Sequence, residues 1–163
     1  MRKKPTIVVI AVMAALAIAV TVLAVINRNH SAEKRQLLAD GAFLVIAGDV
    51  EYKITMAELL SLQPREFEAN YKKSGLDPET RSYTGLPFAE LLRWKGIDSA
   101  GYTTAVFSAA DGYASPISIA DALNENNCYI AIDHEGDGPF RMILAQDQFS
   151  QRWCKLLTDV HLR

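Results

Sequence analysis

One arginine lies inside an apolar run, in the stretch HEGDGPFRMIL (residues 134–144). The stretch opens with acidic and glycine residues suited to a turn and continues as a predicted core strand that contains Arg141. An unpaired guanidinium in a protein interior is strongly unfavourable, so a fold keeps one there only with a partner or a task. Arg141 therefore pairs with an acid such as Asp111 or Asp137, or it binds an anionic ligand.

Metal and nucleophile motifs are the next candidates for chemistry. The acids at positions 133, 135 and 137 resemble the start of a calcium loop, but its twelfth position would be Leu144 instead of glutamate, and Pro139 follows the glycine directly. The histidines lack cysteine or carboxylate neighbours at zinc spacing, and no G-x-S-x-G motif occurs. They are interpreted as surface or structural residues: His30, His134 and His161.

The charge distribution bears on the partners of the chain. The first 26 of the 163 residues hold three of the 17 basic side chains and none of the 19 acidic ones, so the remainder is acidic. A nucleic-acid-binding protein would instead carry a stripe of lysine and arginine. We therefore expect no nucleic-acid partner.

The N-terminal segment predicts a membrane anchor. Residues 5–26 contain no charged side chain, and a helix of that length spans about 33 Å, enough to cross a hydrocarbon core of about 30 Å. A cleaved signal peptide is the alternative, but the small-residue cleavage patterns lie inside the apolar run instead of after it. We expect a cytoplasmic tail over residues 1–4, an anchor over 5–26, a polar spacer over 27–36 and one folded domain over 37–163.

Basic residues flank the apolar run on both sides, so they orient it only weakly. Arg2, Lys3 and Lys4 precede it, and Arg28, Lys34 and Arg35 follow it. The positive-inside rule and the N-terminal cluster favour a single-pass protein of the cell membrane with its domain on the extracytoplasmic side.

Hydrophobic periodicity and turn residues predict an α+β domain. Strand segments alternate in sequence with short helices, and the helices carry recognisable end signals such as the Thr55 and Glu58 capping box and Gly96 after a helical pattern. The expected elements are a hairpin at 42–54, a helix from 55 stopped by Pro64, one or two strands within 65–83, a helix at 87–95, strands at 103–110, 115–118, 128–133 and 139–144, an amphipathic helix at 149–157 and a strand at 159–162.

Four motifs in order carry a family resemblance: YTGLPFAELLRWKGI, VFSAADGYASPISIADAL, GPFRMIL and RWCKLL. Over residues 42–162 they closely resemble the oxidoreductase molybdopterin-binding domain, the sulfite-oxidase fold. The resemblance implies a curved mixed sheet with short helices and a cleft for the pterin and phosphate of a molybdenum cofactor. The enzymes of this family are oxidoreductases. For this anchored chain we also expect a membrane partner protein.

The same resemblance implies the site residues. Arg141 matches an arginine that contacts the cofactor phosphate, and its guanidinium is expected to be solvated in the cleft. At another cofactor contact, five residues earlier, this chain has Gly136 where the enzymes have asparagine or histidine. The pair Arg152 and Trp153 matches the family's lysine and tryptophan near the C-terminus. The resemblance thus implies five ligand-binding residues: Asp111, Tyr113, Arg141, Arg152 and Trp153. The structural alternatives are that Trp153 belongs to the core and that residues 111–113 form a simple turn.

The sequence departs from the enzymes at the metal ligand. No cysteine lies between Leu37 and Leu86, where the family supplies the thiolate that holds molybdenum, and a soft thiolate is hard to replace. We therefore expect a module that binds a pterin or another small anionic ligand, with no covalently bound cofactor and no redox catalysis. The alternative is a molybdopterin-dependent oxidoreductase with atypical metal ligation or a cofactor from a partner chain, and a third interpretation is an interaction domain with an empty cleft.

Cys128 and Cys154 are the two cysteines of the chain. In an extracytoplasmic domain they suit a disulfide, which would close a loop of about 26 residues. They also suit two buried free thiols, one in a strand and one in a helix. The sequence leaves both alternatives open.

Overall fold

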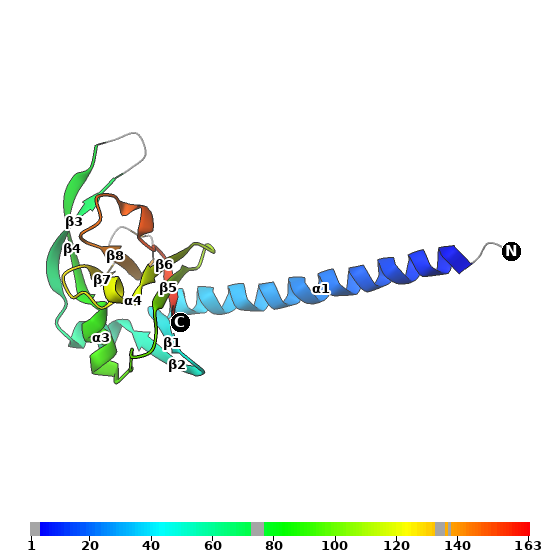
Figure 1. The fold of residues 1–163 in the computed structure, drawn as a ribbon, viewed down its shortest axis with the longest axis horizontal. Coiled ribbons are helices and arrows are strands. Elements are labelled where there is room, and N and C mark those ends of the chain that lie inside the picture. The colour runs from blue at the N-terminus through cyan, green and yellow to red at the C-terminus, as the bar shows by residue number, and fades with distance from the viewer. Residues whose placement is uncertain (1–3, 73–76, 133–135, 137) are drawn as a thin grey trace. The chain divides into compact units, whose positions relative to one another are not determined.

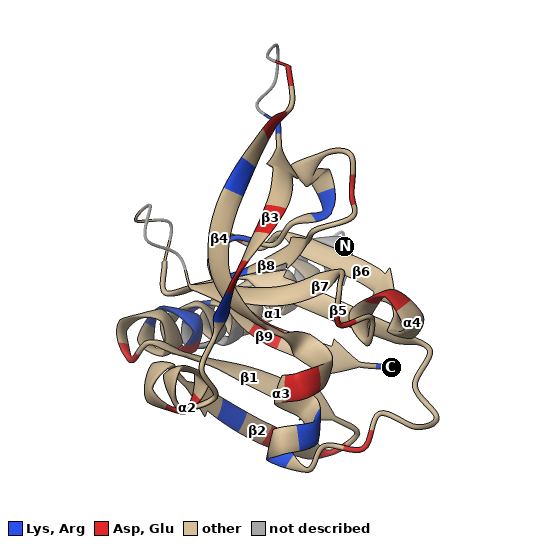
Figure 2. Ribbon diagram, turned by 90° about the vertical axis from the view of Figure 1, so that its left-hand side faces the viewer, with Lys and Arg blue, Asp and Glu red and all other residues tan. Residues whose placement is uncertain are grey.

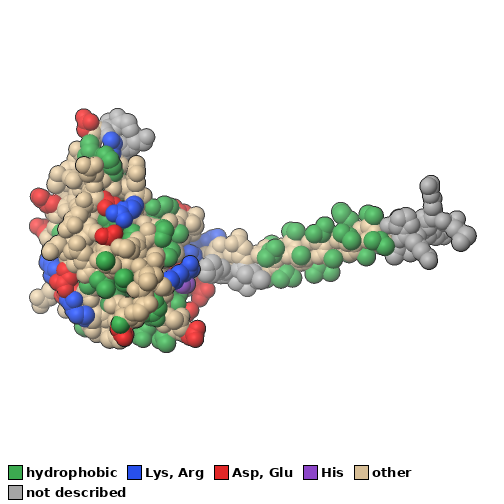
Figure 3. All heavy atoms as spheres, viewed as in Figure 1, with side chains coloured by type: hydrophobic (Ala, Val, Ile, Leu, Met, Phe, Trp, Pro, Cys, Tyr) green, Lys and Arg blue, Asp and Glu red, His purple; other side chains and the backbone are tan. Residues whose placement is uncertain are grey.

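The computed structural model describes residues 4–72, 77–132, 136 and 138–163. The chain divides into two compact units, residues 1–35 and residues 36–163. Helix α1 (Lys4–Ala39) contains one window, Val8–Val25, that is long and apolar enough to cross a membrane. Its hydrophobic side chains are exposed along this window (Figure 3). These features are consistent with single-pass membrane anchoring.

The predicted spacer is helical. Residues 27–36 continue α1, because they contain neither glycine nor proline and include several good helix formers. The helix ends at Ala39, and Gly41 then adopts a positive φ of 59° that leads into the first strand. The compact unit of residues 36–163 begins within the last turn of this helix.

Two sheets and short helices build the domain, which confirms the α+β class (Figure 1). The first sheet, sheet A, has the order β2-β1-β9-β5-β6, with β1 and β9 parallel and its other pairs antiparallel. Its strands are β1 (Ala42–Ala47), β2 (Val50–Thr55), β5 (Thr104–Ala109), β6 (Ala114–Ser118) and β9 (Leu157–Leu162).

The second sheet, sheet B, is antiparallel, with the order β3-β4-β7-β8. Its strands are β3 (Arg65–Tyr71), β4 (Glu79–Pro87), β7 (Cys128–Ile132) and β8 (Phe140–Leu144). The short helices are α2 (Met56–Ser61), α3 (Phe88–Lys95), α4 (Ile119–Ala122) and the 3₁₀ turn η1 (Ser150–Arg152).

Local signals placed several elements correctly. The capping box at α2 is present: the Glu58 backbone N–H donates to Thr55 Oγ1 at 3.3 Å, and the Thr55 N–H donates to Glu58 Oε2 at 2.8 Å. Helix α3 ends at Gly96, whose φ of 70° is left-handed. The hairpin of β1 and β2 turns at Gly48, also with positive φ.

The core lies between the two sheets. Phe140 of β8 meets Phe43 of β1 edge to face, with ring centroids 5.1 Å apart, and both rings are fully buried. Side chains alternate along a strand, so Phe140 and Met142 face sheet A whereas Arg141 and Ile143 occupy the other face of sheet B. We call this other face the inner face, because sheet B curls around it.

Strand β4 is long and curved (Figure 2), and Gly85, two residues before its end, approaches the backbone of β7 closely. Phe67 pairs with Tyr83, before Gly85, whereas Tyr129 pairs with Pro87, after it. Nevertheless, the rings of Phe67 and Tyr129 stack with centroids 3.9 Å apart. The β4 partners of these two residues are four positions apart, so their rings can touch only if β4 bends strongly toward the inner face.

The predicted helix over residues 149–157 is wrong. Only the single 3₁₀ turn η1 forms there; Cys154 then pairs with Met142 beside β8, and β9 begins at Leu157. Leu156 has a φ of 51°, which a right-handed helix does not allow. Pairing with β8 therefore overrides the helical pattern of the sequence.

The disulfide alternative is also wrong, because both cysteines are free and buried. Cys128 of β7 lies opposite Leu144 on one side of β8, and Cys154 lies opposite Met142 on the other side. Two strand spacings separate them by about 10 Å, beyond the limit of about 7 Å between Cα atoms for a disulfide.

Candidate functional site

Five aromatic side chains gather on the inner face of sheet B. Tyr83 and Trp153 meet edge to face at 5.5 Å, and Tyr71 lies 6.1 Å from Trp153. Phe67 stacks on Tyr129 with the ring planes only 10° apart. We call this group the aromatic cluster: Phe67, Tyr71, Tyr83, Tyr129 and Trp153. Phe67 and Tyr83 are half-buried and form its open part, whereas the other three rings are buried.

Two basic side chains lie near the Tyr71 ring of the aromatic cluster, and a third lies over Phe149, outside the cluster. The Arg81 guanidinium carbon lies 4.1 Å from the centre of the Tyr71 ring, and Lys155 Nζ lies 6.0 Å from the same centre. Lys72 Nζ lies 4.5 Å from the ring of Phe149, which is exposed. Arg81 also forms an ion pair with Glu79. Cations at these distances interact favourably with aromatic faces.

Arg141 lies in β8 on the inner face, opposite Ala131 of β7. The bridge between Met142 and Cys154 places Lys155 opposite Arg141 on its other side. Only 1% of Arg141 is exposed, so the expectation of a solvated head group is wrong. The residue is part of the interior of the domain.

Residues 147–155 form a strap that closes the inner face on the side of β8. The Ser150 hydroxyl accepts from the Lys72 N–H at 3.3 Å and donates to the Lys72 carbonyl at 3.1 Å. Trp153 Nε1 donates to the Leu144 carbonyl at 3.2 Å. The strap is thus fixed to the end of β3 and to the end of β8.

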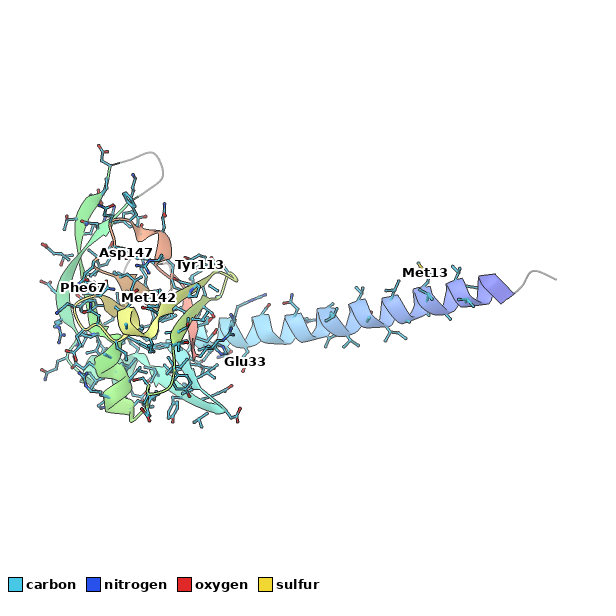
Figure 4. The ribbon with its side chains drawn as sticks, viewed as in Figure 1. Met13, Glu33, Phe67, Tyr113, Met142 and Asp147 are labelled. Atoms are coloured by element: carbon cyan, nitrogen blue, oxygen red, sulfur yellow. The ribbon has the colours of Figure 1, made fainter. Side chains whose placement is uncertain are left out.

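Side chains of β6 and the preceding turn hold the strap from sheet A. The Tyr113 hydroxyl donates to the Gln151 carbonyl at 2.8 Å, and Ser115 Oγ donates to the Arg152 carbonyl at 2.6 Å. Asp111 Oδ1 accepts from the Tyr113 N–H at 2.9 Å and shapes the turn. Figure 4 shows Phe67 at the left edge of the domain and Tyr113 at its right.

Arg152 is engaged by carboxylates outside the aromatic cluster. Its Nε donates to Asp147 Oδ2 at 2.9 Å, its Nη2 bonds the other oxygen of the same carboxylate, and its Nη1 lies 3.7 Å from Asp121 Oδ2. The hydrogen bonds to Asp147, more than the nearby Asp121 charge, raise the pKa of Arg152. Arg152 and Trp153 are neighbours in sequence with different surroundings.

The structure therefore separates the five predicted ligand-binding residues. Arg141 and Trp153 lie on the inner face of sheet B, whereas Tyr113 and Arg152 meet at the strap, and Asp111 lies in the exposed turn beside Tyr113. The β3 and β4 members of the site were not predicted from the sequence. The signal was the alternation of Phe67, Ala69 and Tyr71 on one face of a strand, hidden among charged residues.

Comparison with known proteins bears on the fold. No protein-family model matches the chain, and no curated protein matches it. The crystal structure of the sulfane dehydrogenase SoxCD from Paracoccus pantotrophus is similar, with a TM-score of 0.61 and 13% sequence identity. The match covers 77% of this chain and 38% of that chain, so the chain spans well under half of its neighbour's length. At this identity the likeness shows the fold alone.

The family resemblance in the sequence implies a molybdenum cofactor, so the fit of the described residues to its metal can be tested. Both cysteines are fully buried, and burial, together with the charge of Asp121, raises the pKa of the Cys128 thiol. Neither sulfur is placed to ligate a metal as a thiolate. Among residues 4–72, 77–132, 136 and 138–163, no three histidine, cysteine or acidic side chains group to hold a metal ion. The described residues do not fit the metal.

Proposed function

We propose that this protein is a membrane-anchored, extracytoplasmic module that binds a pterin or another small anionic ligand without redox catalysis. The observation that carries the proposal is the aromatic cluster with basic residues at one end, on the inner face of a sulfite-oxidase-like sheet. A pterin is a planar ring system, and stacking on aromatic side chains with a few polar groups for orientation is how such ligands are usually held.

The open part of the aromatic cluster is the proposed docking surface. Phe67 already stacks in parallel on Tyr129, which shows that this face accommodates closely stacked rings. Phe67 and Tyr83 each keep part of their surface in solvent, so a planar ligand reaches them without unfolding the sheet. Arg81 and Lys155 supply positive charge at the Tyr71 ring of the same cluster.

The five residues predicted from the sequence take different parts in this proposal. Trp153 forms the buried wall of the aromatic cluster, and Arg141 supports the same face from within. Tyr113 and Arg152 hold the strap in place, and Asp111 fixes the turn that presents Tyr113. In this assignment Asp111, Tyr113 and Arg152 act through the strap as positioning residues.

The buried thiols of Cys128 and Cys154 support the proposal of a module without redox chemistry, because neither is accessible to a metal. Protein purified from its native membrane is expected to hold less than about a tenth of a molybdenum atom per chain, because stable fixation of the metal needs a protein thiolate. Elemental analysis after gel filtration measures this content. Near-stoichiometric molybdenum would favour the alternative, a molybdopterin-dependent oxidoreductase with atypical ligation.

The extracytoplasmic location is proposed from the basic residues Arg2, Lys3 and Lys4 before the apolar helix. A membrane partner protein, which could receive a binding signal, belongs to the same proposal. Protease added to intact cells stripped of their outer layers tests the orientation. Cleavage of the domain supports it, and full protection until the membrane is opened contradicts it.

A further inference from the structure

Sheet B has an open edge at β3. Among the strands that the structure describes, β3 pairs only with β4, whereas β8, at the opposite edge, is bridged by Cys154 through Met142. In sheet A, Pro116 removes a backbone donor from the edge strand β6, and the edge strand β2 carries Lys53, which pairs with Asp40. Proline and lysine protect such edges from further pairing. With 7 residues, β3 is the longest edge strand, and its sequence contains neither proline nor lysine.

The hydrogen-bond pattern of sheet B determines which backbone groups of β3 face this edge. Met142 exchanges both backbone hydrogen bonds with Cys154, so its groups point away from β7. Alternation across the registers of β7 and β4 then directs the odd-numbered residues of β3 toward β4 and the even-numbered ones outward: Glu66, Glu68 and Asn70. The next even-numbered residue, Lys72, agrees with this pattern, because the Ser150 hydroxyl bonds both its N–H and its carbonyl. Three residues of β3 therefore offer backbone groups to an additional strand.

Two carboxylates mark the outer face of this edge. Glu66 and Glu68 are exposed, and they lie on the same face of β3, about 7 Å apart along the strand. Their neighbours on β4 are uncharged, Thr84 and Ser82. Phe67 lies between them on the inner face and is half-buried. A second copy of β3 would bring like charges together, which is unfavourable, whereas a strand with basic side chains on the outer face complements them.

We propose that β3 is a docking edge for an extended segment of a partner protein, with basic residues at alternate positions and apolar residues between them. The segment adds a fifth strand to the four of sheet B, through backbone hydrogen bonds to the outward-facing residues of β3. Its basic side chains lie beside Glu66 and Glu68, and an apolar side chain lies beside Phe67. The inference rests on the partner protein of the proposed function and is independent of pterin binding.

A short fluorescent peptide of alternating lysine and valine tests this inference. The peptide is titrated into the purified full chain in uncharged detergent, without pterin, and binding is followed by fluorescence anisotropy. A peptide with glutamate in place of lysine is expected to bind at least about tenfold more weakly, because each attraction across the two strands becomes a repulsion. Glu68→Lys is expected to weaken binding of the lysine peptide about fivefold for the same reason.

Matched controls separate strand addition from charge attraction alone. Glu51→Lys reverses one exposed carboxylate on β2, an edge strand of sheet A, and is expected to leave binding unchanged. Two further peptides are N-methylated at every lysine or at every valine, which blocks opposite sides of the added strand. One of them is expected to bind at least about tenfold more weakly than the parent peptide, and the other is expected to bind as the parent does.

Several outcomes would overturn the inference and leave pterin binding itself standing. They are absence of binding by the lysine peptide, full binding to the Glu68→Lys variant, and equal binding of the two methylated peptides. Analytical ultracentrifugation adds a further one, because a chain that dimerises and thereby excludes the peptide would assign β3 to a second copy instead of a partner protein.

Discussion

Gly85→Ala is expected to lower the free energy of unfolding by about 3 kcal/mol, the upper range for overpacking a tight interior. A Cβ at this position would lie 2.7 Å from the Ile130 carbonyl oxygen and 2.9 Å from the Ala131 Cα. Both are backbone atoms of the neighbouring strand, so no side chain can move aside. Thermal unfolding of the purified protein should show a melting temperature lower by about 10 °C.

Gly101→Ala is the matched control for this substitution. Gly101 has a φ of 87°, and no atom lies within 4 Å of the position that a Cβ would take, so alanine meets backbone strain there without a clash. Its expected cost is about 1 kcal/mol. Equal melting losses for the two variants would show that β4 and β7 can separate, and that the close approach at Gly85 does not maintain the curl.

Arg141→Ala is expected to destabilise the ligand-free protein by about 3–5 kcal/mol, the cost of removing one partner from a buried charged interaction. Arg141 is 1% exposed and interacts within the fold, so its loss leaves buried polar groups uncompensated as well as a void. Chemical denaturation of the ligand-free protein, followed by circular dichroism, measures this change.

Two variants accompany that measurement. Arg152→Ala removes an arginine that is 46% exposed, and an exposed ion pair of this kind contributes about 1 kcal/mol or less. Arg141→Met fills most of the arginine's volume without its charge, so the difference between Arg141→Met and Arg141→Ala reports the packing contribution. An unchanged denaturation midpoint for Arg141→Ala would mean that the guanidinium is solvated, as the family resemblance implied.

Short-range signals made much of the fold predictable. The Thr55 and Glu58 capping box needs only four consecutive residues, and the end of α3 at Gly96 needs only a glycine after a helical pattern. The strands at β5, β7 and β8 follow from runs of β-branched and aromatic residues bounded by turns. Each of these features is decided within a few residues along the chain.

The failures have a common physical cause in long-range pairing. Residues 149–157 have a helical pattern, but the pairing of Cys154 with Met142 and the Ser150 bonds to Lys72 prevent an α-helix there. The disulfide alternative failed because β8 lies between Cys128 and Cys154, and the spacing of the cysteines in the sequence does not reveal this. A sequence pattern carries no information on which strand lies between two others.

The candidate site was predictable only in part for the same reason. Arg141 and Trp153 were identified through motifs, and they do lie on one face of sheet B. Phe67, Tyr71 and Tyr83 were not identified, because their meeting with Trp153 and Tyr129 depends on the curvature of β4. The residues that hold the strap, such as Ser150, likewise gain their role only from contacts far along the chain.

The most direct test of a pterin-binding, non-redox module is the content of pterin in protein purified from its native membrane. The protein is denatured under low oxygen, the released small molecules are oxidised to their fluorescent form, and pterin is quantified against protein in the same fractions. We expect pterin to co-elute with the protein at a substantial fraction of one per chain and to be reduced in Phe67→Ala, a variant of the open edge of the aromatic cluster. Protein that is folded and free of pterin, and that takes up none when pterin is supplied, would show that the module does not bind pterin.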